Sequence, residues 1–272
     1  MIDFSKGGYK GDEIEEMFEE FTKKHMPHYW YFREVLRANV QPSDWWKKKT
    51  GIPLTEEESK DLIIISFIMY HIYTCLGESI NFDQMIEDAL LKSINNGTRI
   101  FEVKKNWKAA YSSLYTSLNA MANLSLILAG NKLIFDPSKN RPWNYTPNKA
   151  IEIFNNLSLN IFSNPIQNCS NRLEIRHHLD HYWTIWIKIN WGEFKFDRDF
   201  TKGHAPISQP QNWIDAKSKL SEDIINTAKD LDSLFFELSR PNGSLDNYLN
   251  NKSIVIDYSD YGVPHNGQRP QL

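Results

Sequence analysis

The stretch NWKAAYSSLYTSLNAMANLSLILAGN, residues 106–131, carries the clearest helical pattern in the sequence. Large apolar side chains recur in it at spacings of three and four, which places them along one stripe of an α-helix. These stripe residues are Trp107, Tyr111, Leu114, Leu118, Met121 and Leu128. The Ser, Ala and Asn residues between them let a second helix approach closely, and Gly130-Asn131 is a stop signal. The stretch therefore predicts a long helix within a helical bundle.

Segments on both sides of this stretch have the same periodicity and predict further helices. We expect these helices over residues 12–25, 55–76, 81–93, 147–162, 171–186 and about 211–239. Thr55 with Glu58 and Asn171 with Glu174 are capping pairs that indicate helix starts. Thr146 followed by Pro147 indicates a third start. Gly77 is interpreted as a helix stop. The fold class predicted for the chain is therefore all-α.

A different period occurs in TIWIKINWGEFKFD at residues 184–197, where apolar and polar residues alternate around Trp191-Gly192. This alternation predicts a small β-hairpin, with a continued helix as the alternative. The sequence has no internal repeat, Gly/Ser linker or low-complexity block. We therefore expect a single helical domain over residues 1–272, with a tail at about 262–272 that frays.

Composition limits the classes of partner. The net charge of −3, from 31 basic and 34 acidic residues, argues against binding nucleic acid or anionic lipid by bulk electrostatics, although a local basic patch remains compatible with it. Cys75 and Cys169 have no CxxC or Cys/His cluster around them, so neither a disulfide framework nor a structural zinc site is expected. The most apolar run, LIIISFIMY at residues 62–70, is too short to span a membrane, and no signal peptide is visible. We expect a cytoplasmic protein with no membrane partner.

The densest group of reactive side chains is NRLEIRHHLDHYW, residues 171–183. On a helix, His177 and His181 share the polar side with Asp180 between them, and Arg176 lies nearer the apolar edge. Arg172 falls on the apolar side, where it needs a buried partner. The group is interpreted in three ways, of which the plainest is a solvated face combined with structural ion pairs.

The other two interpretations are chemical. His177 and His181 stand one turn apart and could bind zinc, with Asp180 or His204 as a third ligand. Alternatively, a histidine transfers protons while an arginine stabilises the charge on a phosphate in its transition state. Cleavage of RNA without a metal needs only these two roles, because the ribose 2′-hydroxyl is the nucleophile.

The motif RHHLDH, Arg176–His181, resembles the Arg, polar residue, three residues, His signature of the HEPN superfamily. Members are helical-bundle proteins, many of them ribonucleases of toxin–antitoxin, abortive-infection and CRISPR systems. The resemblance covers about residues 55–190 and implies a HEPN-like bundle with N- and C-terminal helical additions. It implies that Arg176 contacts the phosphate, that His181 is the general acid/base and that His177 orients its neighbours. Candidate substrate-binding residues are Arg172, His178, Asp180 and Tyr182.

The leading hypothesis is accordingly a metal-independent endoribonuclease of a bacterial defence or toxin–antitoxin type system, with RNA as substrate and no cofactor. Arg176 and His181 are about 140° apart on one helix, so they can act on one substrate only if it lies across the helix or if a second chain completes the cleft. We therefore expect a homodimer, and an antitoxin or regulatory protein as a further partner. The alternatives are a non-catalytic helical binding or assembly module and, third, a zinc-dependent hydrolase that uses His177 and His181. The looser register from Arg172 to His177 or His178 also satisfies the motif.

Overall fold

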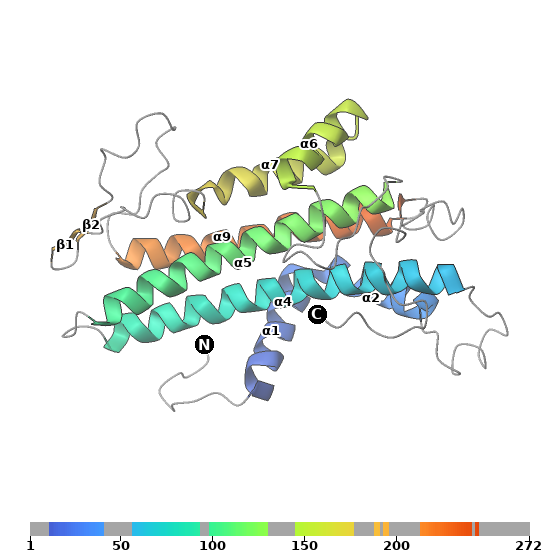
Figure 1. Cartoon of the computed structure of the whole chain (residues 1–272). Helices are drawn as coiled ribbons and strands as arrows, with labels where there is room; N and C mark the ends of the chain where they lie inside the picture. Colours follow the sequence, from blue (N-terminus) through green and yellow to red (C-terminus); the bar gives the residue numbers. More distant parts are fainter. Residues whose placement is uncertain are drawn as a thin grey trace. The chain divides into compact units, whose positions relative to one another are not determined.

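The computed structural model describes residues 11–40, 56–92, 98–129, 145–176, 188–190, 193–195, 213–240 and 243–244. These residues are almost all helical (Figure 1), which confirms the all-α prediction. The helices are α1 (Gly11–His25), α2 (Pro27–Val40), α4 (Glu56–Lys92), α5 (Thr98–Leu128), α6 (Pro147–Asn156), α7 (Asn160–Arg172) and α9 (Trp213–Ser239). None of the helices in these ranges is both long and apolar enough to cross a membrane.

Two short strands form the hairpin that the alternating segment predicts. Strands β1 (Lys188–Asn190) and β2 (Glu193–Lys195) pair antiparallel. Ile189 lies opposite Phe194, on either side of the expected turn. The hairpin interpretation is therefore confirmed, and the alternative of a continued helix is wrong for this segment.

Helix α4 replaces the two helices that were expected over 55–76 and 81–93. It runs from Glu56 to Lys92 without a stop at Gly77. A Cβ atom at Gly77 would lie 3.0 Å from the Phe18 ring, closer than ordinary van der Waals contact. The glycine therefore allows α1 to approach α4 rather than ending the helix, and the boundary predicted at this position is wrong.

The region of α6 and α7 also differs from the expected boundaries. Thr146 caps α6 as predicted and accepts a hydrogen bond from the Lys149 amide at 3.3 Å. However, α6 ends at Asn156, and Ser158 adopts a left-handed conformation with φ 56° before α7 begins. Pro165 lies inside α7 instead of after a helix. Asn171 occupies the last turn of α7, so its predicted role as the cap of a new helix is wrong.

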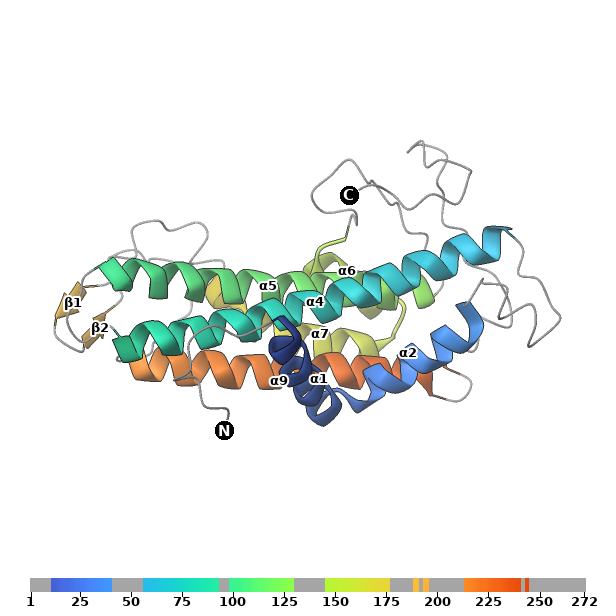
Figure 2. The same ribbon diagram turned by 90° about the horizontal axis from the view of Figure 1, so that it is seen from below.

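The chain divides into two compact units. Unit 1 comprises Met1–His25, Thr74–Ser117 and Cys169–Lys229, and unit 2 comprises Met26–Tyr73, Leu118–Asn168 and Asp230–Leu272. Helices α4, α5, α7 and α9 contribute residues to both units. Within unit 1, the α4, α5 and α9 segments lie side by side (Figure 2) and hydrogen-bond to one another. The prediction of a single domain stays a prediction.

The cores of both units contain the stripe that was predicted on α5. Trp107, Tyr111 and Leu114 are buried in unit 1, and Leu118, Met121 and Leu128 are buried in unit 2. Unit 1 adds Leu76 and Leu220, among others, while unit 2 buries a group from five helices: Phe32, Ile72, Phe154, Phe162 and Phe235. Burial of this apolar surface is the main force that holds each unit together.

Candidate functional site

Polar side chains from α5 and α9 meet in the interior of unit 1. The Tyr111 hydroxyl donates a hydrogen bond to the Asp223 carboxylate at 2.7 Å. Tyr111 is fully buried and Asp223 is 2% exposed. Lys219 Nζ, one turn before Asp223 on α9, lies 3.4 Å from the same carboxylate. A buried carboxylate thus has both a hydroxyl donor and a cation beside it, as buried charges require.

Burial dominates the electrostatics of this pair. It raises the pKa of Asp223, while the hydrogen bond from Tyr111 and the charges of Lys219 and Arg172 act in the opposite direction. Burial, followed by the charge of Asp223, also raises the pKa of Tyr111 well above its ordinary value. Tyr111 therefore keeps its proton and remains a hydrogen-bond donor throughout the neutral range.

A second carboxylate ties α4 to α9 in the same unit. Asp83 accepts a hydrogen bond from the Ser221 hydroxyl at 2.9 Å, and Lys217 Nζ lies 3.8 Å away. Lys217 also pairs with Glu87 at 2.9 Å. Burial raises the pKa of Asp83, and Lys217 and Ser221 oppose that shift. These contacts fix one face of α9 against α4.

Two of the arginines singled out by sequence lie beside this cluster. Arg172, at the end of α7, is half-buried and lowers the pKa of Asp223 by its charge. Asp223 is thus a buried negative charge that acts on Arg172. Arg176 lies one turn later, and its guanidinium carbon is 4.2 Å from the centre of the Tyr115 ring. Both arginines therefore interact with residues of α5 or α9 in unit 1.

The remaining candidates lie outside the described residues: His177, His178, Asp180, His181 and Tyr182. The geometry of Arg176 with His181 stays a prediction. Among the residues that the structure does describe, no three His, Cys, Asp or Glu side chains are grouped to hold a metal ion. Because His177 and His181 are not among them, the zinc alternative remains untested.

Sequence reasoning missed Tyr111 and Lys219 as partners of a carboxylate, Tyr115 as a partner of Arg176, and Asp223 itself. Tyr111 was assigned to the apolar stripe, and its hydroxyl was not considered. Asp223 follows Leu220 by three positions and precedes Thr227 by four, so it lies on the buried face of α9. An acidic residue on the apolar face of an amphipathic helix is the signal that could have identified it.

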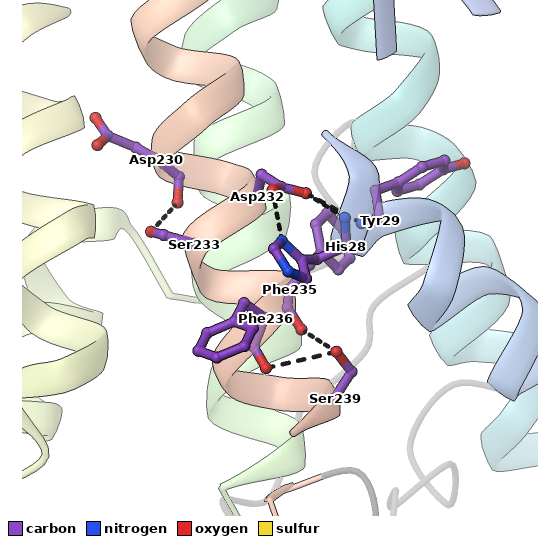
Figure 3. Close-up of polar contacts among 8 residues, drawn as sticks. All are labelled: His28, Tyr29, Asp230, Asp232, Ser233, Phe235, Phe236 and Ser239. Carbon is purple, nitrogen blue, oxygen red and sulfur yellow. Dashed lines mark hydrogen bonds and ion pairs between the residues drawn. The ribbon is translucent and has the colours of Figure 1, made fainter. Parts of the chain in front are cut away.

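Unit 2 contains a separate polar group at the start of α2 (Figure 3). Asp232 Oδ1 accepts hydrogen bonds from the backbone amides of His28 at 2.8 Å and Tyr29 at 3.2 Å. Its Oδ2 atom lies 2.7 Å from His28 Nδ1. A carboxylate only accepts hydrogen bonds, so Nδ1 carries the proton in this pair. Asp232 therefore caps α2 from another helix, and His28 strengthens the cap.

The surroundings of His28 favour this structural role. The edge of its ring meets Phe236, with ring centres 4.9 Å apart (Figure 3). Asp230 points away from the pair, and Ser233 donates its hydroxyl hydrogen bond to the Asp230 carbonyl. His28 thus has a structural role in the cap of α2. The cluster around Arg172 and Arg176 is the candidate functional site.

Comparisons with protein-family models, with curated proteins and with solved structures gave no significant match.

Proposed function

We propose that the protein is a HEPN-like, metal-independent endoribonuclease in which Arg176 contacts the scissile phosphate. The observation that supports this proposal is the position of Arg176 against the ring of Tyr115. Its guanidinium carbon lies 4.2 Å from the centre of that ring, within the range of a cation–π contact. Stacking on a ring engages the flat face of a guanidinium, and its N–H edge is the part that matches a phosphate.

The surroundings of the two arginines bear on the register of the motif. In the looser register, Arg172 would act together with His177 or His178, and the buried carboxylate of Asp223 acts on its charge. The register from Arg176 to His181 places the catalytic arginine one turn further along the chain. We therefore assign the structural role to Arg172 and the phosphate contact to Arg176.

The chemistry needs two groups. His181 removes the proton of the ribose 2′-hydroxyl, and the resulting oxygen attacks the adjacent phosphorus. Arg176 stabilises the added negative charge of the phosphorane. The bond to the 5′-oxygen then breaks, and that oxygen takes up a proton. The products are one RNA end with a 2′,3′-cyclic phosphate and one with a 5′-hydroxyl.

The test uses the full chain and a labelled single-stranded RNA in EDTA. Arg176→Ala and His181→Ala should each lower the cleavage rate by roughly 10²-fold, the scale of losing a positioned acid/base or an electrostatic stabiliser. A 2′-deoxy substitution at the scissile position should block the reaction. Mass spectrometry should find 2′,3′-cyclic phosphate ends.

The matched control for Arg176 is Arg33 of α2. Its guanidinium carbon lies 4.8 Å from the centre of the Trp30 ring, so it makes the same kind of contact away from the motif. Arg33→Ala should leave cleavage unchanged. The proposal fails if the wild-type protein cleaves no RNA, or if Arg33→Ala and Arg176→Ala have equal effects.

The proposal includes a homodimer with the segment 171–183 near its axis, which light scattering at micromolar concentration tests.

The second candidate function is a binding or assembly module in which the arginines only hold the bundle together. The interaction of Arg172 with the buried Asp223 favours it. It predicts that Arg176→Ala, like Arg172→Ala, lowers thermal stability and that the wild-type protein has no ribonuclease activity.

A further inference from the structure

The aromatic residue beneath Arg176 belongs to a column on α5. Trp107, Tyr111 and Tyr115 stand four residues apart, so their side chains lie on one side of the helix. The first two rings meet edge to face with centres 5.7 Å apart. Trp107 and Tyr111 are buried, while Tyr115 at the end of the column is half-buried. Tyr115 therefore presents its ring from a firmly packed helix.

The contact with Arg176 joins parts of unit 1 that are distant in the sequence. A separation of 4.2 Å between the guanidinium carbon and the ring centre places the cation directly on the ring, well within the range of about 6 Å for an attractive cation–π contact. Arg172 and Arg176 are four residues apart, as are Tyr111 and Tyr115. The charge of Arg172 acts on the carboxylate that Tyr111 binds, so the two segments interact at two successive turns.

We propose that Tyr115 is the positioning residue for Arg176 in RNA cleavage. This inference rests on the proposed function, and it concerns how the phosphate-binding arginine is held. An unsupported arginine side chain has many rotamers, and ordering it during the reaction lowers the rate. A ring that holds the guanidinium plane in advance preorganises the charge for the phosphorane. Tyr115 itself touches neither the RNA nor the reacting atoms.

The role predicts which property of Tyr115 matters. Tyr115→Phe keeps the ring and should retain a cleavage rate close to that of the wild type. Tyr115→Leu and Tyr115→Gln remove the ring and should lower kcat by about 2- to 30-fold, the range expected from losing one cation–π contact. KM should change little, because Arg176 can still reach the phosphate.

The decisive experiment is a double-mutant cycle on the full chain, with single-turnover cleavage of the same labelled RNA as readout. If Tyr115 acts through Arg176, Tyr115→Leu should have no further effect in a protein that already carries Arg176→Ala. Thermal denaturation checks that each variant is folded, and Tyr115→Gln replaces Tyr115→Leu if the latter fails to fold.

Two failures are distinguishable. If the wild-type protein cleaves no RNA, the proposed function is overturned and the positioning role with it. If the wild-type protein cleaves RNA, but removing the Tyr115 ring has no effect or has the same effect with and without Arg176, only the positioning role is overturned. Loss of activity in Tyr115→Phe would also overturn it, because the hydroxyl rather than the ring would then be required.

Discussion

Helix α9 carries two buried aspartates, Asp223 in unit 1 and Asp232 in unit 2, that have different partners. Their exposed fractions are 2% and 8%, so the degree of burial does not separate them. Asp232 accepts hydrogen bonds from two backbone amides at the start of α2 and from His28. Asp223 accepts one from a tyrosine hydroxyl and has Lys219 and Arg172 nearby.

The difference separates a carboxylate that caps a helix from one that interacts with side chains. Amides at the first turn of a helix have no partners within that helix, and their dipoles favour a negative charge. Asp232 therefore belongs to the helical framework of unit 2. The partners of Asp223 are the side chains of Tyr111 and Lys219. The arginines of the motif lie in the same unit as Asp223.

The largest expected effect comes from removing the cap. Asp232→Ala leaves two amides and the His28 ring without their acceptor, and we expect the free energy of unfolding to fall by about 3 kcal/mol. Urea denaturation at pH 7, followed by circular dichroism, measures it. Asp232→Asn should cost less, because its amide oxygen can still accept from the backbone.

The control for this variant is Glu222→Ala, an exposed position on the same helix, which should change stability by less than about 0.5 kcal/mol. If Asp232→Ala is as mild as Glu222→Ala, the cap does not support the fold, and the contrast between the two aspartates is lost.

The cap also explains which part of the fold the sequence did not predict. Helix α2 was not expected, because Met26 precedes it and has no side-chain acceptor for the first amides. Asp232 supplies that acceptor from the far end of the chain. Similarly, Gly77 was interpreted as a helix stop from its local signal. Its contact with Phe18 is tertiary, so the local sequence does not indicate it. Local patterns predicted the α5 stripe, the α6 cap and the hairpin. The cap of α2 and the continuation of α4 past Gly77 depend instead on residues distant in the sequence.

The candidate site, like the fold, was predicted from the sequence only in part. The sequence identified Arg172 and Arg176 and required a buried partner for Arg172, because a charge on an apolar face needs one. It did not identify Asp223 or Tyr115, since the pairing of α7 with α5 and α9 is set by packing. The roles proposed for His177 and His181 come from the family resemblance and stay predictions.

The second prediction tests the partner of Asp223. Tyr111→Phe removes a buried hydroxyl and leaves the carboxylate with one donor fewer, so we expect the free energy of unfolding to fall by about 1.5 kcal/mol. The same change in a protein that carries Asp223→Asn should have a smaller effect, because the two groups interact. Urea denaturation of all four proteins measures the coupling.

Tyr31→Phe is the matched control, because Tyr31 is 56% exposed. It should leave stability nearly unchanged. Equal effects at Tyr31 and Tyr111 would show that the hydrogen bond inside unit 1 contributes nothing to the fold.

The smallest expected effect is a pH dependence confined to unit 1. The pKa of Asp223 is raised mainly by burial, so the folded protein takes up a proton there at a higher pH than the unfolded chain does. Stability should therefore rise, relative to Asp223→Asn, as the pH falls from 7 toward about 4, by at most about 1.4 kcal/mol per pH unit. Tyr111, Lys219 and Arg172 oppose this shift. Asp83, whose pKa is also raised, contributes equally to both proteins and cancels. Unfolding free energies with the same pH dependence in the wild type and in Asp223→Asn would contradict this prediction. The two aspartates would then differ only in their hydrogen bonds.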